Sequence, residues 1–324
     1  MKRETIYLLM GVVVFAFSGV ALGQDKYPSQ PIGLVVPYGP GGSADVLARL
    51  YGEDLSKALK VPVTVVNRAG GTGINGTASV ARAKKDGYTL LQGTSNALIL
   101  LPIISKEVNY DPLKDLIPLA HFASVPSVLV VKSDSPFRTL DDVVDYARKN
   151  PGKLNNGGTG FGSESQFNLD VLCIRNKIQI NSIPFTGGGE VLSAILGGHV
   201  DLSFLALPTM GPQIKAGKLR ALAVTSKTRH PDFPSISTTA ELGHPDVKFR
   251  LGLGVLAPAG IPKPVLDVLI PTLEKIFKSP ELVQHATSAS FSVEYMGSEE
   301  YRKFIETGIQ STEKIVRELN FVKK

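Results

Sequence analysis

The residue types best suited to chemistry gather in three glycine-rich turns, at 39–45, 157–166 and 186–190, each predicted to open a helix. A helix N-terminus presents backbone N–H groups without intrahelical partners together with the positive end of the helix dipole, so it can hold an anion without a charged side chain. An ordinary tight turn can have the same composition. Because the pattern occurs three times, across two predicted lobes, we expect a shared cleft for an anionic ligand.

Three polar side chains in these turns could act on a ligand. Ser43 and Ser163 stand where helices are predicted to begin, so their hydroxyl groups can cap the helix or donate a hydrogen bond to a bound oxyanion. Asp45 falls in the first helical turn, where a carboxylate interacts favourably with the helix dipole. We therefore interpret Asp45 as a capping residue rather than a catalytic acid.

Nucleotide binding is poorly supported. The sequence GGSAD at 41–45 lacks the G-x-x-x-x-G-K-[ST] spacing that places a lysine on the β and γ phosphates. A G-x-G-x-x-G pattern does occur at Gly71, Gly73 and Gly76, after a predicted strand. The acid that would bind a ribose about 20 residues later is missing, because Asn96 and its neighbours lie there. Dinucleotide binding stays open as a minor alternative.

A secreted hydrolase is a second alternative, without recognisable catalytic residues. No G-x-S-x-G sequence surrounds Ser43, Ser95 or Ser163, and the five histidines are far apart in the chain. The histidines form no H-x-x-x-H pair, and Cys173 is the only cysteine, which excludes an intramolecular disulfide and disfavours a zinc site. We expect neither a catalytic centre nor a cofactor.

The elements that must position the turns alternate between strands and helices. The apolar run at 32–36 predicts a strand, residues 44–59 have helical spacing, and residues 61–66 predict a further strand. Such alternation is typical of α/β lobes whose mostly parallel sheets are flanked by helices.

The second lobe contains a helix with clear end signals. Thr139 precedes Asp141 and Asp142 at the predicted helix start, and Pro151 closes the helix. A chain of 324 residues should form two domains.

No Pro/Gly/Ser-rich linker separates the two domains, so the chain is expected to cross between them through ordinary strands, near 125–131 and 251–256. Residues 125–250 then form an inserted second lobe, and residues 24–124 and 251–324 form the first.

The N-terminus resembles a secretory signal peptide. Lys2 and Arg3 precede an apolar stretch at 6–22, and the small residues ALG at 21–23 predict cleavage before Gln24. A retained membrane anchor is the less favoured alternative, because the run has about the minimum spanning length. We expect a periplasmic protein.

The charge distribution argues against nucleic-acid binding. Loss of Lys2, Arg3 and Glu4 with the signal peptide lowers the formal charge from +6 to +5. The remaining basic residues are scattered among acids, without a basic stripe interleaved with aromatic residues. At most, we expect a mild preference for small anions.

Taken in order, several segments closely resemble the extracytoplasmic receptors of tripartite tricarboxylate transporters, the Bordetella uptake family. The segments begin at Tyr27 and extend almost to the C-terminus: YPSQPIGLVVPYGPGGSADVLARL, VNRAGGTGINGTASVARAKKDGYTLL, NYDPLKDLIPL, GGHVDLSFLALP, IKAGKLRALAVTS and LAPAG. The resemblance implies a type II periplasmic-binding-protein fold, in which two α/β lobes joined by crossing strands close on a small carboxylate. It also implies that the acid is held, partly through water, between the turns at 38–45 and 159–163.

Neither of these turns contains Arg or Lys, so backbone N–H groups, hydroxyls and water must neutralise the ligand charge. The sequence departs from the family pattern at Gly158, Gln166 and Leu205, where Ser, His and an acidic residue are common in relatives. Leu205 disfavours an amino acid, whose ammonium would need a carboxylate, and leaves room for an apolar or aromatic acid.

We therefore expect a non-enzymatic receptor that delivers a carboxylate to membrane transporter subunits or to a sensor ectodomain. We expect it to act as a monomer, and a scaffold protein with an empty cleft is the remaining alternative. The candidate ligand-binding residues are Tyr38, Gly42, Ser43, Ala44, Asp45, Thr94, Ser95, Thr159, Gly160, Gly162, Ser163, Thr186 and Leu205.

Overall fold

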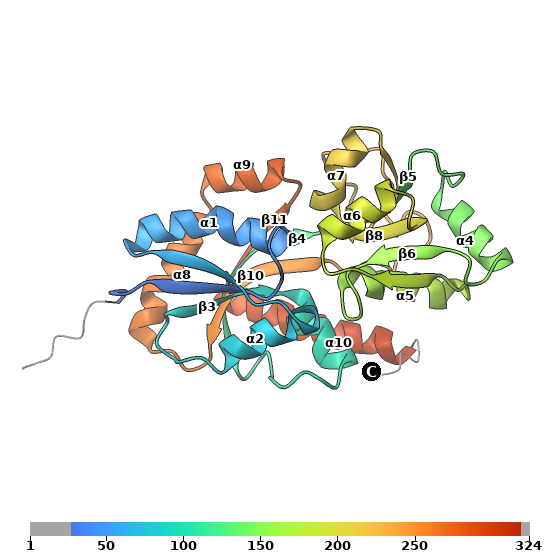
Figure 1. Cartoon of the computed structure of the whole chain (residues 1–324). Helices are drawn as coiled ribbons and strands as arrows, with labels where there is room; N and C mark the ends of the chain where they lie inside the picture. Colours follow the sequence, from blue (N-terminus) through green and yellow to red (C-terminus); the bar gives the residue numbers. More distant parts are fainter. Residues whose placement is uncertain (1–26, 319–324) are drawn as a thin grey trace, which may run out of the picture.

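The computed structural model describes residues 27–318 and consists of two α/β lobes, each built on its own sheet (Figure 1). This architecture confirms the two-lobed α/β fold predicted from the sequence. The predicted signal peptide lies outside the described residues.

The first lobe contains a six-stranded sheet with the order β11-β4-β10-β3-β1-β2. Its strands are β1 (Ile32–Val36), β2 (Val63–Asn67), β3 (Thr89–Thr94), β4 (Leu116–Val125), β10 (Leu251–Pro258) and β11 (Ser292–Gly297). Strand β1 pairs in parallel with β2 and β3, whereas β10 runs antiparallel to β3 and β4, and β11 antiparallel to β4.

The second lobe contains a five-stranded sheet with the order β7-β6-β8-β5-β9. Its strands are β5 (Ser127–Lys132), β6 (Asn155–Gly158), β7 (Asn181–Pro184), β8 (Leu202–Ala206) and β9 (Leu219–Val224). Strand β6 is parallel to β7 and β8, and β5 is antiparallel to β8 and β9.

The expectation of mostly parallel sheets therefore needs a correction, because both sheets are mixed. The reason is clearest in the first lobe. Strand β4 carries the chain toward the second lobe and β10 brings it back, so these neighbours run in opposite directions.

Helices cover both faces of the first sheet, because successive side chains of a strand point to opposite faces. Ile32, Leu34 and Val36 of β1 belong to a core shared with α1, α8 and α9, whereas Val35 belongs to a second core with α2 and α10. The bounds of these helices are α1 (Ser43–Leu59), α2 (Ile74–Ala81), α8 (Lys263–Phe277), α9 (Pro280–Ser288) and α10 (Ser298–Glu318).

The second sheet is covered in the same way. Leu129 and Val131 of β5 pack in the core that contains α4 and α5, and Val128 and Val130 pack in the core that contains α6 and α7. These helices are α4 (Leu140–Lys149), α5 (Glu164–Asn176), α6 (Gly188–Leu196) and α7 (Leu207–Lys215). Helix α4 begins after Thr139, as the sequence predicted, and its start is a capping box between Thr139 and Asp142.

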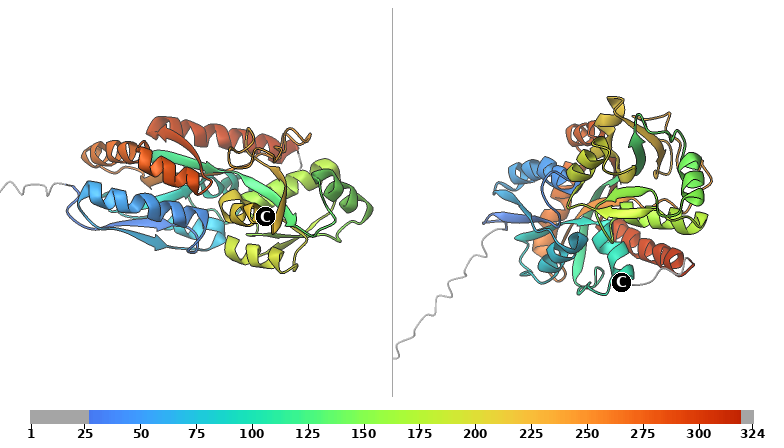
Figure 2. Two further views of the ribbon diagram at one scale, coloured as in Figure 1. Left: turned by 90° about the horizontal axis from the view of Figure 1, so that it is seen from above. Right: turned by 45° about the vertical axis from the view of Figure 1, so that its right-hand side comes forward.

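The lobes are joined by more than the crossing strands. Helix α10 starts on the first lobe and extends along the second (Figures 1 and 2), where Ile315 and Val316 pack against the second-lobe core. Arg175 of α5 lies 3.4 Å from Glu318 at the end of this helix. We retain 24–124 with 251–324, and 125–250, as proposed lobe boundaries.

A short helical segment connects β3 to β4 in the first lobe. It consists of the π-helical turn η2 (Asn96–Leu100) and α3 (Leu101–Ile104), while a 3-10 turn, η1 (Gly71–Gly73), precedes α2. Within residues 27–318, no helix has both the length and the apolar character needed to cross a bilayer.

Candidate ligand-binding site between the lobes

The first glycine-rich turn leaves the N-terminus of α1 without a side-chain cap. The N-cap residue is Gly42, in an extended conformation with φ −80°. A Cβ atom built on Gly39, Gly41 or Gly42 would meet no heavy atom of the protein within 4 Å. The space beside the turn is therefore open, and a ligand can approach the backbone N–H groups at the start of α1.

Asp45 holds this turn together. Its Oδ2 accepts hydrogen bonds from the Gly41 N–H (2.9 Å) and from Arg49 Nε (3.0 Å), while Oδ1 accepts from Asn67 Nδ2 (2.9 Å). The residue is only 3% exposed. Burial alone would raise its pKa, but the hydrogen bonds from Arg49, Gly41 and Asn67 outweigh this effect and hold the pKa below its usual value. These contacts give Asp45 a structural role in the turn, but it does not cap α1 as the sequence analysis expected, because its backbone partner, Gly41, precedes the N-cap residue Gly42.

Tyr38 links the first turn to the interior of the first lobe. Its hydroxyl donates to the backbone oxygen of Thr72 (2.9 Å) and lies 3.2 Å from Thr94 Oγ1. Burial raises the pKa of Tyr38 to about 12, so the phenol stays protonated and remains a hydrogen-bond donor.

The second turn, which precedes α5, is capped by its own serine. Ser163 Oγ accepts from the Gln166 N–H (3.2 Å) and donates to the backbone oxygen of Gly160 (2.7 Å). Its hydroxyl proton is therefore used within the turn. Gly160 and Gly162 have φ values of +88° and +79°, a left-handed conformation that favours glycine.

Three side chains that the sequence analysis did not select connect the two turns. Thr72 Oγ1 donates to the backbone oxygen of Phe161 across the lobes (2.7 Å). Asn96 Nδ2 donates to Glu164 Oε2 (2.8 Å) and lies 3.5 Å from the hydroxyl of Tyr38. The structure thus brings the first and second turns together through Thr72, Asn96 and Glu164.

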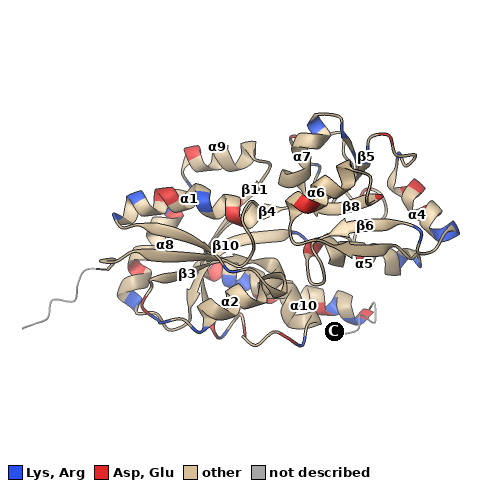
Figure 3. Cartoon of the chain, in the orientation of Figure 1, with Lys and Arg blue, Asp and Glu red and all other residues tan. Residues whose placement is uncertain are grey.

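The third turn again leaves a helix uncapped. The N-cap of α6 is Gly187, which has no side chain, and a Cβ atom on Gly187 or Gly189 would meet no atom within 4 Å. Thr186 donates from its N–H (3.0 Å) and its hydroxyl (2.7 Å) to Glu190, so this threonine is used locally. Helices α1 and α6 each carry an acid in the first turn, Asp45 and Glu190. Figure 3 shows that each helix begins at its end nearer the other lobe.

The remaining predicted residues occupy different environments. Ala44 and Leu205 are buried in the cores of the first and second lobes, and Leu205 Cδ2 would lie 3.4 Å from a Cβ on Gly188. Thr159 is half-buried within the second turn, directly after β6. Their contribution to a ligand site stays a prediction.

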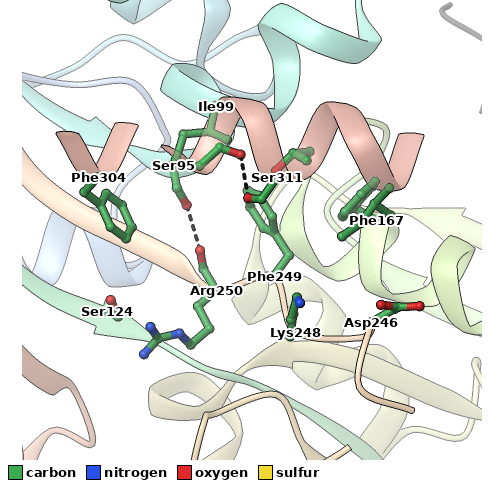
Figure 4. Close-up of a pocket in the computed structure, with 13 residues that line it drawn as sticks. Ser95, Ile99, Ser124, Phe167, Asp246, Lys248, Phe249, Arg250, Phe304 and Ser311 are labelled. Carbon is green, nitrogen blue, oxygen red and sulfur yellow. Dashed lines mark hydrogen bonds between the residues drawn. The ribbon is translucent and has the colours of Figure 1, made fainter. Parts of the chain in front are cut away.

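Ser95 lines a pocket at the junction of the lobes (Figure 4). Its hydroxyl donates to the backbone oxygen of Arg250 (2.7 Å) and accepts from the Gly252 N–H (2.9 Å). The pocket encloses about 200 Å³ and is also lined by Ile99, Phe167 and residues of α10. The consecutive residues Ser95 and Asn96 therefore have different partners, because Ser95 contacts the backbone of Arg250 and Gly252 whereas Asn96 contacts Tyr38 and Glu164.

The G-x-G-x-x-G pattern has a structural explanation. Gly73 has φ +103°, and a Cβ on Gly76 would lie 2.6 Å from backbone atoms of Arg68 and Pro37. Both positions therefore need glycine for the turn and for close packing. In the described part of the chain, no group of three or more His, Cys, Asp or Glu side chains is placed to hold a metal ion.

Comparison with known proteins agrees with this geometry. Residues 47–321 match the model of the tripartite tricarboxylate transporter family receptor. Protein BugT of Bordetella pertussis is 32% identical over 321 residues, which cover 98% of each chain.

Two solved structures are similar over most of the chain. The periplasmic binding protein BugD has a TM-score of 0.85 at 28% identity, covering 92% of this chain and all of its own. A protein of R. palustris solved with adipate also has a TM-score of 0.85 at 28% identity, covering 91% and 98%. The chain therefore belongs to the receptor family of the tripartite tricarboxylate transporters and has the fold of a periplasmic binding protein.

Proposed function

We propose that the protein is an extracytoplasmic receptor that captures a small carboxylate between its lobes and delivers it to a membrane transporter. The observation that carries this proposal is the uncapped N-terminus of α1, which borders open space in a turn without Lys or Arg. A carboxylate is matched to such a site, because N–H groups and the helix dipole compensate one or two negative charges on a compact group. The adipate bound to the related R. palustris protein supports the same ligand class.

The first turn offers the ligand backbone groups and one hydroxyl. Ser43 is the first residue of α1, and within residues 27–318 its side chain has no hydrogen-bond partner. It can therefore donate to a ligand oxygen without breaking a contact. The uncapped start of α6, on the other lobe, supplies a second set of N–H groups. Closure of the lobes would let both helices contact one ligand.

A receptor role is favoured over a hydrolase. The Ser163 proton is directed to the backbone oxygen of Gly160, so this serine lacks the hydrogen bond to a base that a nucleophile needs. The glycine pattern at 71–76 is explained by turn geometry and packing. Neither alternative therefore has a specific observation in its favour.

The expected partners are membrane transporter subunits or a sensor ectodomain, with the receptor acting in the periplasm as a monomer. Mass spectrometry of the cell envelope fraction should find an N-terminus at or near Gln24. An intact Met1 in the cytosolic fraction would contradict export.

A thermal-shift screen of mono-, di- and tricarboxylates, aromatic acids, amino acids and sugars tests the ligand class. A true ligand at about 100 times its dissociation constant should stabilise the folded protein by roughly 2.7 kcal/mol. The proposal is wrong in its substrate class if sugars raise the melting temperature and no carboxylate does.

A further inference from the structure

Glu164 is a buried acid between the lobes without a basic partner. It is the first residue of α5 and is only 5% exposed. Asp45 is the other buried acid among residues 27–318, and it forms an ion pair with Arg49. No ion pair involves Glu164 in the same part of the chain. Burial raises the pKa of its carboxyl, and the hydrogen bonds from Asn96 and from its own backbone N–H only partly oppose this effect.

Asn96 connects this acid to the first turn. Its Nδ2 is 2.8 Å from Glu164 Oε2 and 3.5 Å from the hydroxyl of Tyr38, which belongs to the turn where we place the ligand. The side-chain oxygen of Asn96 has no hydrogen-bond partner among the described residues, although Asn96 is only 2% exposed. Glu164 and Asn96 thus form a polar cluster that has an unsatisfied acceptor and contacts Tyr38 of the first turn.

The groups that face Glu164 cannot neutralise its charge. From the first turn it faces Tyr38, which stays protonated, and from η2 it faces the amide of Asn96. The preceding turn at 159–163 and the neighbouring η1 contain no charged residue. A carboxylate that enters this site therefore adds a second negative charge near an unpaired one. Repulsion between two carboxylates that share a site of low polarity raises the pKa of one of them and so favours its protonation.

We propose that Glu164 determines the charge selectivity of the site, so that the receptor binds a carboxylate together with one proton, which Glu164 takes from solvent. This inference rests on the proposed function. In the proton uptake, a Glu164 oxygen forms an O–H bond with a proton released by water or buffer, and no other bond changes. The neutral carboxyl group then contributes a hydrogen-bond donor that the ionised form lacks.

Glu164→Gln imitates the neutral state, because its amide has nearly the shape of a protonated carboxyl group and can donate to the Asn96 oxygen. The matched control is Glu53→Gln, which removes the same charge from an exposed position on α1. The probe is adipate, or the carboxylate that gives the largest thermal shift if adipate gives none. Isothermal titration calorimetry between pH 6.5 and 8.5, in buffers with different ionisation enthalpies, measures affinity and proton uptake together.

We expect wild type and Glu53→Gln to take up close to one proton per ligand at the alkaline end, where affinity falls by up to tenfold per pH unit. Glu164→Gln should take up none, bind with nearly constant affinity across this range, and bind at least tenfold more tightly than wild type at pH 8.5.

Three results would overturn the inference, and they can be told apart. Wild-type binding without proton uptake would show that Glu164 keeps its charge state. Loss of carboxylate binding in Glu164→Gln, with a stable fold, would show that binding needs the carboxyl group of Glu164 itself and not merely the loss of its charge. If no carboxylate binds wild type or either variant at any pH, the proposed function is wrong, and the inference that rests on it is contradicted as well.

Discussion

The first and second glycine-rich turns are alike in sequence and different in their contacts. Each leads from a strand into a helix, and each places a buried acid in the first helical turn. Asp45 is held within its own lobe by Arg49, Asn67 and the Gly41 N–H. Glu164 instead contacts Asn96 of the other lobe and has no ion pair among the described residues.

This difference assigns the two turns different tasks. In the first turn Asp45 stabilises the loop while Gly42 leaves the helix N-terminus open to a ligand. In the second turn Ser163 caps the helix, and the contacts of Phe161 and Glu164 join the lobes. A glycine-rich turn before a helix is therefore not sufficient to identify an anion site, because the partners of its N–H groups and side chains decide its role.

The largest expected effect comes from closing the space beside the first turn with Gly42→Val. Its φ of −80° is accessible to valine, and a Cβ there meets no protein atom within 4 Å, so the variant should fold normally. The branched side chain would keep a carboxylate from the N–H groups. Each charge-assisted hydrogen bond contributes about 1.5–3 kcal/mol, so losing two should weaken binding by at least about 100-fold.

Calorimetric titration with the carboxylate found in the thermal-shift screen measures this loss. The control is the melting temperature without ligand, which should match that of wild type. Wild-type affinity in a normally folded Gly42→Val protein would show that the first turn is structural and that the anion site lies elsewhere.

The two buried acids should differ in their contribution to stability. Asp45→Ala leaves the Gly41 N–H and the Asn67 amide without their buried acceptor, so we expect a loss of about 2 kcal/mol in the free energy of unfolding. Glu164→Gln should leave stability unchanged or raise it, because it removes an unpaired buried charge. Urea denaturation at pH 7.5 measures the free energy of unfolding of both variants. Equal destabilisation would contradict the different roles assigned to Asp45 and Glu164.

The same pair should show opposite pH dependences. The folded-state pKa of Asp45 is lowered, so its contribution is fully present above the unfolded value of about 4 and is lost as pH falls further. The folded-state pKa of Glu164 is raised, so its ionisation reduces stability increasingly as pH rises above about 4.3 and through the raised pKa. The stability advantage of Glu164→Gln over wild type should therefore grow between pH 4.5 and 8.5. A constant difference would contradict this.

Ser163→Ala should lower the free energy of unfolding by about 1 kcal/mol, because it removes a helix cap and the bond to Gly160. Ser279→Ala is a matched control, since Ser279 caps α9 in the same way, far from the second turn. Urea denaturation should show similar losses in the two variants. Only Ser163→Ala should also weaken ligand binding, and unchanged stability would mean that its cap contributes nothing.

The smallest expected effect is that of Ser43→Ala. Because the Ser43 hydroxyl has no partner among residues 27–318, stability should stay within about 0.5 kcal/mol of wild type. Binding should weaken by about 0.5–1.5 kcal/mol, or about 1.5–3 kcal/mol if the hydroxyl donates to a charged oxygen. Titration calorimetry of Ser43→Ala and Ser163→Ala tests whether the first turn contacts the ligand directly and whether the second turn mainly stabilises the fold. Lower stability with unchanged affinity in Ser43→Ala would reverse that assignment.

The amino-acid sequence by itself determined the local elements and the fold class. The apolar run at 32–36 is strand β1, and Thr139 caps α4 in a box with Asp142. Ser163 was correctly expected to be able to cap a helix. These features depend on hydrogen bonds between residues three or four apart, or on side chains that point alternately to the two faces of one strand. A local pattern in the sequence is therefore sufficient to predict them.

Only the tertiary structure decided which side chains meet between the lobes. Asn96 and Glu164 are 68 residues apart, and Thr72 and Phe161 are 89 residues apart, so their contacts follow from how two separately formed sheets pack together. The antiparallel pairing of β10 likewise depends on the return of the chain from the second lobe. Ser95 and Asn96 stand where β3 passes into η2 and contact different parts of the junction, Arg250 and Glu164. No local pattern in the sequence specifies these partners.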